Sequence, residues 1–162
     1  MKKVLKIIVV VLFVALAGIQ FIRPNFNNPQ VVEAETLEAS TEVPEDVGQI
    51  LKTSCYDCHS NQTVYPWYSR ISPVSWWLAD HIREGRGELN FSVWNTYNNR
   101  RKAHKLEEIC ENIESKAMPL PSYLWGHGDA ELSPEKIKIL CDWANREKAK
   151  LESAAPPETE KK

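Results

Sequence analysis

The stretch SCYDCHSNQ, residues 54–62, places two cysteines three positions apart and a histidine directly after the second. Three kinds of site share parts of this pattern: a covalent haem attachment site, half of a zinc site and a redox-active dithiol. In haem attachment, two thiols add to the two vinyl groups on one porphyrin edge, and the adjacent histidine binds the iron. Cys55, Cys58 and His59 therefore predict one covalently bound haem c per chain, with His59 as the proximal iron ligand.

The zinc and dithiol interpretations find less support in the rest of the chain. A structural zinc site needs a second pair of closely spaced ligands. The remaining candidates stand singly: Cys110, Cys141, His81, His104 and His127. A dithiol of the thioredoxin type expects strands around it, whereas the apolar spacing here is helical. Both interpretations stay open as weaker alternatives.

A second iron ligand is suggested by elimination. The chain has two methionines, and Met1 lies at its start, so a thioether ligand would have to be Met118. The surrounding segment KAMPLPSYLW, residues 116–125, contains two prolines that prevent a helix from continuing. Such a loop would let Met118 lie across a haem face, although a single Met ordinarily fills a gap in a core. His81 and His127 are the alternative ligands.

The hydrophobic pattern of the domain predicts an all-α fold. Apolar residues recur at helical spacing, and no alternating stretch bounded by hairpin turns is present. We expect one helix from Pro44, one from Ser72 to Gly85, one around 106–113 and one from Ser133 onwards, with Asn90 capping a shorter element. These helices would form a single domain over residues 43–151.

The chain outside this domain divides into three segments. Residues 1–22 contain three lysines followed by an apolar run, which predicts a signal or a membrane anchor. Counted from residue 4 to 22, the run would make a helix of roughly 28 Å, close to the thickness of a bilayer core. The lysines would stay cytoplasmic and direct the domain to the periplasmic side. Residues 23–42 predict a flexible tether, and residues 152–162 predict a disordered tail.

Two further groups of residues invite a role beside a haem. Arg70, Arg83 and Arg86 are candidate partners for haem propionates, although solvated surface arginine is the simpler interpretation. The basic cluster within residues 100–105 is either a docking patch or a plain exposed helix face. Cys110 and Cys141 lie on the apolar faces of two helices, and the sequence leaves open whether they form a disulfide.

The chain resembles a family of small bacterial haem-binding domains with a single C-x-x-C-H motif, related to the monohaem c-type cytochromes. The resemblance covers nearly all of residues 43–145. Besides the motif itself, the matching segments are Tyr65–Tyr68, Trp76–Trp77 with His81, Asn90–Trp94, and Met118–Pro119 before Tyr123. It implies a cytochrome-c-like helical fold in which the first and last helices pack together. It also implies that Cys55 and Cys58 attach the haem while His59 and Met118 bind its iron.

These observations predict a membrane-tethered electron carrier that transforms no substrate itself. A His/Met-ligated iron would change between ferric and ferrous while it exchanges electrons with redox partner proteins, which the sequence does not identify. The alternative is a haem peroxidase or small-ligand sensor with a labile sixth ligand. A net charge of -2 disfavours nucleic acid as a partner.

Overall fold

The computed structural model describes residues 1–154, and all regular secondary structure in this range is helical. The α-helices are α1 (Lys2–Ile19), α2 (Leu37–Ser40), α3 (Glu45–Ser54), α4 (Tyr56–His59), α5 (Val74–Glu88), α6 (Asn99–Glu114), α7 (Pro121–Leu124) and α8 (Pro134–Ser153). The short 3-10 helices are η1 (Glu33–Glu35), η2 (Trp67–Arg70), η3 (Phe91–Thr96) and η4 (Gly128–Ala130). The predicted all-α fold is therefore confirmed.

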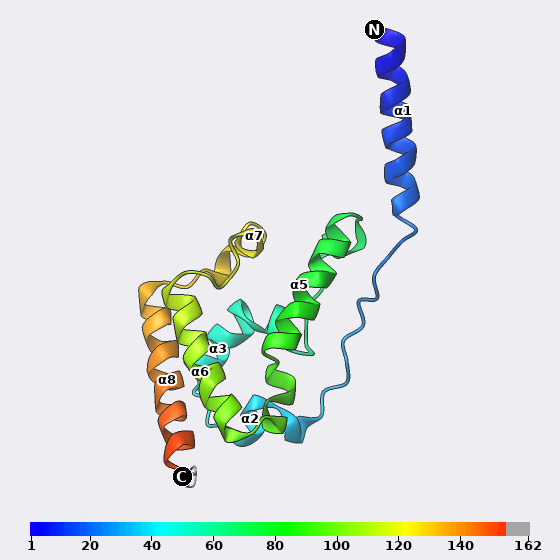
Figure 1. The fold of residues 1–162 in the computed structure, drawn as a ribbon. Helices are drawn as coiled ribbons and strands as arrows, with labels where there is room; N and C mark the ends of the chain where they lie inside the picture. The colour runs from blue at the N-terminus through cyan, green and yellow to red at the C-terminus, as the bar shows by residue number, and fades with distance from the viewer. Residues whose placement is uncertain (155–162) are drawn as a thin grey trace, which may run out of the picture.

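The core lies where α3, α6 and α8 meet (Figure 1). The two long helices α6 and α8 run side by side, and α3 packs against α8. Leu51, Leu106 and Leu140 from these three helices are essentially inaccessible to solvent. The expected packing of the first and last helices of the domain is thus present, and burial of these apolar side chains stabilises it.

Local sequence signals explain some of the helix starts. Ser133 accepts a hydrogen bond from the Lys136 amide and is followed by proline, so α8 begins as predicted. Asn90 accepts from the Ser92 amide and caps η3. The second predicted helix differs at both ends. It begins at Val74 with Pro73, and not Ser72, at the cap position, where no side chain caps the helix. It also continues through Gly85 to Glu88, and its Leu89 cap amide donates to the Gly85 carbonyl.

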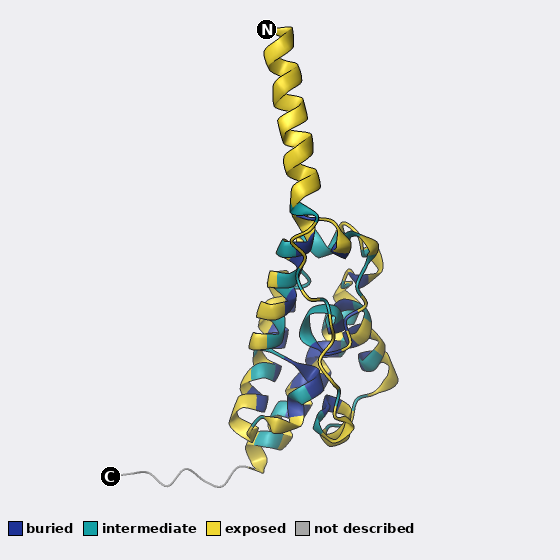
Figure 2. Ribbon diagram, turned by 90° about the vertical axis from the view of Figure 1, so that its right-hand side faces the viewer, coloured by how far each residue is buried: buried dark blue, intermediate teal, exposed yellow. Residues whose placement is uncertain are grey.

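The N-terminal helix α1 stands apart from the domain, and all of its residues except the last, Ile19, are exposed (Figure 2). It ends at Ile19, and lysines 2, 3 and 6 lie within it, so its uninterrupted apolar part is about 20 Å long at 1.5 Å per residue. Within residues 1–154, no helix is both long enough and apolar enough to cross a membrane. The prediction of a membrane-spanning helix is therefore corrected.

The segment expected to be a flexible tether contains ordered structure. Residues 33–40 form η1 and α2, both of which pack against η3. Leu37 is fully buried in the core, so this part of the segment belongs to the packed domain. At the other end, α8 extends to Ser153, and the remainder of the predicted tail, residues 155–162, lies outside the described residues.

Candidate functional site

The C-x-x-C-H motif forms a single helical turn at the end of α3. Cys55 caps α3, and its carbonyl accepts hydrogen bonds from the amides of Cys58 at 3.2 Å and His59 at 2.9 Å. This turn lets both thiols and the imidazole line one cavity of about 430 Å³. The motif residues that the sequence singled out are therefore brought together at one site.

His59 is held by two carbonyl groups at the end of α5. Its Nδ1 lies 2.9 Å from the Gly85 oxygen and 3.1 Å from the Leu89 oxygen. Because both partners only accept hydrogen bonds, the proton must be on Nδ1, and Nε2 keeps its lone pair. Burial lowers the pKa of His59, which further favours the neutral ring. A neutral imidazole with a fixed tautomer is ready to bind a metal through Nε2.

The helices α4 and α5 approach each other more closely than a side chain would allow. A Cβ atom added at Gly85 would lie 2.7 Å from the Cys58 carbonyl oxygen and 3.2 Å from the Cys58 Cβ. Only glycine fits this contact without a backbone shift. The sequence suggested Gly85 as the end of a helix, whereas its main role is to let α5 supply a carbonyl to His59.

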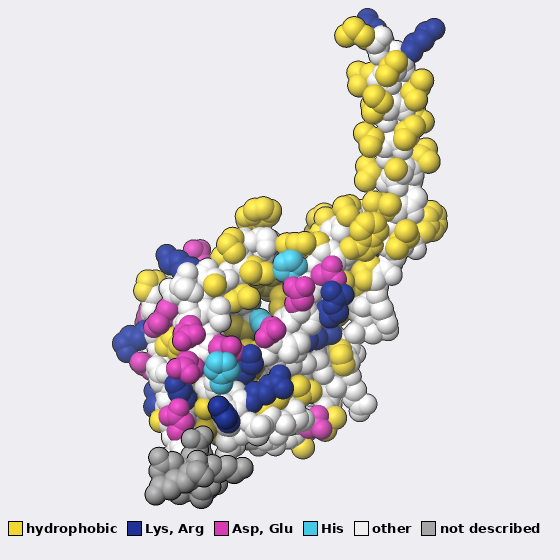
Figure 3. All heavy atoms as spheres, in the orientation of Figure 1, with side chains coloured by type: hydrophobic (Ala, Val, Ile, Leu, Met, Phe, Trp, Pro, Cys, Tyr) yellow, Lys and Arg dark blue, Asp and Glu magenta, His cyan; other side chains and the backbone are white. Residues whose placement is uncertain are grey.

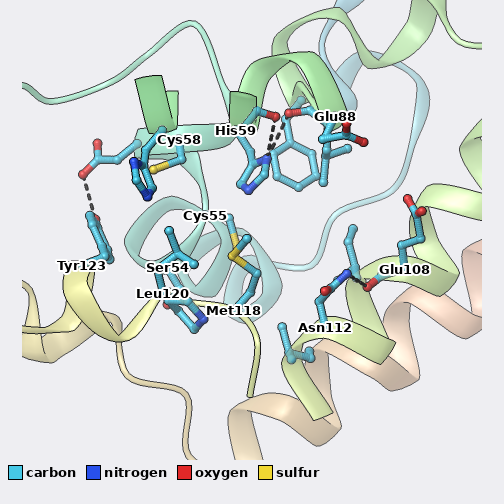
Figure 4. Close-up of a pocket in the computed structure, with 18 of the residues that line it drawn as sticks. Ser54, Cys55, Cys58, His59, Glu88, Glu108, Asn112, Met118, Leu120 and Tyr123 are labelled. Carbon is cyan, nitrogen blue, oxygen red and sulfur yellow. Dashed lines mark hydrogen bonds between the residues drawn. The ribbon is translucent and has the colours of Figure 1, made fainter. Parts of the chain in front are cut away.

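Met118 lies on the opposite side of the cavity from His59 (Figure 4). It stands in the loop between α6 and α7, where its amide donates a hydrogen bond to the Asn112 carbonyl at 3.0 Å. The loop follows the end of α6 at Glu114, in agreement with the predicted break before the prolines. The remaining wall is largely apolar and includes Leu89, Phe91, Ile109, Ile113, Leu120 and Leu132.

Asp57, between the two motif cysteines, links the motif to α7. Its carboxylate accepts hydrogen bonds from the Tyr123 hydroxyl at 2.8 Å and from the Val64 amide at 2.9 Å. Burial, followed by the bond to Asp57, raises the pKa of Tyr123, so its hydroxyl stays protonated as the donor. Neither residue was predicted to have a role, because the motif pattern leaves the positions between its cysteines unspecified.

The raised pKa values of the Cys55 and Cys58 thiols disfavour the dithiol alternative. Burial, and secondarily the neighbouring Cys58, raises the pKa of Cys55 to about 12. Burial and the Asp57 carboxylate raise the pKa of Cys58 to about 11. A redox dithiol needs a lowered thiol pKa to produce the thiolate nucleophile. Across residues 1–154, no group of three or more His, Cys, Asp or Glu side chains has a metal-binding arrangement, so the second half of a zinc site is not assembled either.

The donor set of the cavity fits a c-type haem. Two thiols lie beside an imidazole whose free nitrogen is available, a thioether lies across the cavity, and apolar side chains form most of the remaining wall. Fixed imidazole orientation and an apolar surrounding are the features by which proteins hold and tune a haem iron. Cys55 and Cys58 would hold the group covalently, and His59 and Met118 would be its axial ligands.

The other predicted candidates have different positions. His81 lines the same cavity, and its Nδ1 lies 2.9 Å from the Trp77 carbonyl oxygen. His127 does not line the cavity, and its ring stacks on Tyr123. The three arginines considered for propionates do not line it either. Arg86 instead donates hydrogen bonds to Ser60 and Thr63 in the loop after the motif, and to Asn28.

Cys110 and Cys141 are neighbours on α6 and α8. Both are buried free thiols, and burial raises the pKa of each. The structure therefore answers the question that the sequence left open with two free thiols in the core.

Comparison with known proteins gives one match. A family model described as a haem-binding domain matches residues 14–146, about four fifths of the chain. No curated protein and no solved structure matches the chain significantly. The match includes every residue of the cavity described above.

Proposed function

The chain belongs to the haem-binding domain family, and we propose that it is a monohaem c-type cytochrome that transfers electrons by an outer-sphere mechanism. One observation carries this proposal: His59 and Met118 lie on opposite sides of a cavity that Cys55 and Cys58 also line. His59 and Met118 would both bind the iron of a covalently held haem, and an iron bound by two protein side chains in both oxidation states suits an electron carrier.

Each residue would have a distinct part in this function. The sulfur atoms of Cys55 and Cys58 would each form a thioether bond to one vinyl group, with the thiol hydrogen going to the other vinyl carbon. Haem supplies the one-electron chemistry of its iron when bound. His59 would donate through Nε2 while the carbonyls of α5 fix its orientation. The Met118 thioether would favour a comparatively high reduction potential.

The apolar wall supports rapid electron exchange with little rearrangement. Phe91 and Ile109 are buried and form part of the apolar wall on the side of the core. A dry and fixed surrounding lowers the reorganisation that accompanies a change of charge at the iron. Such a protein would need no substrate pocket of its own, and redox proteins would be its partners.

We further propose that the domain works on the extracytoplasmic side of a membrane. Support comes from the lysines and the apolar stretch at the N-terminus, an order typical of export segments. The apolar side chains of α1 are exposed along its length, and they would associate with lipid without crossing the bilayer.

The test is a spectroscopic one on the full chain, produced with the cytochrome c maturation machinery in a bacterial periplasm. We expect a pyridine haemochrome of the c type that stays with the denatured chain, and a weak sulfur-to-iron charge-transfer band in the oxidised form. A covalent haem with a high-spin spectrum and rapid reaction with peroxide would instead favour the peroxidase or sensor alternative, for which His81 lies at the cavity. Absence of covalent haem would contradict the proposal.

A further inference from the structure

The charged side chains that line the haem cavity are unevenly distributed. Across residues 1–154, Lys105 is the one Lys or Arg among them. Four carboxylates line the same cavity: Asp57 on α4, where the Tyr123 hydroxyl binds it, Glu84 and Glu88 on α5, and Glu108 on α6. Figure 3 shows acidic and basic side chains around the hollow in this face of the molecule.

Lys105 lies deeper than the carboxylates it contacts. Its side chain is 11% exposed, compared with 35% for Glu108 and 82% for Glu88. Its Nζ lies 2.6 Å from a carboxylate oxygen of Glu108 and 3.7 Å from one of Glu88. An ammonium group loses hydration when it is covered to this extent, and it then needs anionic partners. The Lys105 ammonium group is thus a partly desolvated positive charge between the end of α5 and the middle of α6.

The position of this cation relative to the cysteines indicates what it would meet. Vinyl groups occupy one edge of the porphyrin and the two propionates occupy the opposite edge. Once the vinyl edge is fixed to Cys55 and Cys58, the propionates must point to the far side of the cavity. Figure 4 shows Glu88, Glu108 and Asn112 on that far side, across from Cys58. Lys105 forms ion pairs with Glu88 and Glu108, so it lies on the same side.

We propose that Lys105 is the propionate-binding residue of this protein, an inference that rests on the proposed haem function. Two propionates entering beside Glu84, Glu88 and Glu108 would repel these carboxylates, and Lys105 is the cation available to offset the repulsion. Its ammonium exchanges part of its contact with Glu108 for a contact with a propionate. Glu108 is partly exposed and can turn toward solvent.

This arrangement has a definite effect on the iron. A positive charge near the haem disfavours the ferric state, which carries one more positive charge than the ferrous state, and so it raises the reduction potential. A nearby carboxylate acts in the opposite direction. Lys105 and Glu108 therefore influence the potential with opposite signs, although they are partners in one ion pair.

The experiment compares four full-length holoproteins with the wild type: Lys105→Gln, Lys105→Arg, Glu108→Gln and Lys148→Gln. Reduction potentials are measured by spectroelectrochemistry, and the propionate bending modes by resonance Raman spectroscopy. Lys148 is the matched control, because it is a partly covered lysine in an ion pair with Glu107, 2.9 Å away, and does not line the cavity.

We expect Lys105→Gln to lower the potential and shift the propionate modes, Glu108→Gln to raise the potential, and Lys105→Arg to stay near the wild type. Lys148→Gln should change neither measurement.

Equal shifts in Lys105→Gln and Lys148→Gln would reduce the effect to net charge and overturn the proposal, as would unchanged propionate modes. If Lys105→Gln yields no holoprotein, the arginine and Glu108 variants decide. A wild type without covalent haem would be a failure of the proposed function itself, which the haemochrome assay detects separately.

Discussion

His59 and Met118, on opposite walls of the cavity, differ in how strongly the surrounding structure fixes their side chains. On one wall, His59 shares its Nδ1 proton between the Gly85 and Leu89 carbonyls, and a contact that only glycine permits locks α4 against α5. On the other wall, Met118 stands in a loop, held through its backbone amide, and a thioether is at most a weak hydrogen-bond acceptor. The His59 wall is therefore preorganised, whereas the Met118 wall can adjust.

The largest effect should come from removing the preorganised ligand. His59→Ala deletes the proximal nitrogen and removes the imidazole donor from the Leu89 carbonyl, whereas the Gly85 carbonyl keeps the Leu89 amide as a donor. We expect loss of essentially all mature holoprotein, measured as covalent haem per chain after export. Cys58→Ala should reduce covalent attachment by a separate route, through loss of one thioether. Normal haem content in His59→Ala would show that this wall does not determine assembly.

Gly85→Ala tests the contact behind His59. The added Cβ would meet backbone atoms of Cys58 at 2.7 Å, which must move apart. We expect a loss of about 1–3 kcal/mol in the free energy of unfolding, the usual range for overpacking. Urea denaturation followed by circular dichroism measures it.

The same helix supplies a control for this substitution. Gly87→Ala places its Cβ in open space, and it should be neutral or stabilising by up to about 1 kcal/mol, because alanine is the better helix former. Equal effects of the two alanine substitutions would mean that the close approach of α4 and α5 is not needed for stability.

Met118→Ala probes the adjustable wall and should do less to assembly. Covalent haem content should stay near the wild type, because attachment depends on Cys55, Cys58 and His59. The spectrum should change from low-spin to high-spin, and added imidazole should restore the low-spin form. Absorption spectra with and without imidazole check this. A spectrum unchanged from the wild type would remove Met118 from the iron and point to His81 as the distal ligand.

The smallest effect should come from a surface pair outside both walls. Lys148 donates a hydrogen bond to Glu107 and lowers the pKa of that carboxyl. A lowered folded-state pKa stabilises the fold above the unfolded value of about 4.3, and this contribution is lost as the pH falls through the folded value. Glu107→Gln should thus be slightly less stable than the wild type at pH 7. The difference should shrink as the pH falls below about 4.3, and thermal unfolding across this pH range measures it.

The sequence predicted the parts of the fold that local patterns encode. Apolar spacing and the Ser133 cap located α8, and the prolines after Met118 marked the end of α6. The C-x-x-C-H motif named three of the residues that line the cavity. These features depend on residues a few positions apart, which is why they can be recognised without a structure.

The features that the sequence missed depend on contacts between distant segments. Gly85 looks like a helix end until Cys58, 27 positions earlier, is found against it. Leu37 looks like part of a tether until the core formed by other helices covers it. Lys105 looked like a member of an exposed basic cluster, and only the structure shows that its side chain is mostly covered and paired with Glu88 and Glu108.

If His59 binds the haem iron as proposed, its hydrogen bonds would also connect the iron to the position of α5. Both acceptor carbonyls come from the C-terminal end of α5, which is the negative pole of the helix dipole. They draw the Nδ1 proton away from the ring and give the imidazole partial anionic character, so that Nε2 becomes a stronger electron donor. Sliding α5 along its axis would weaken this donation. A partner that binds the exposed surface of α5 and displaces the helix would therefore change the electron density at the iron.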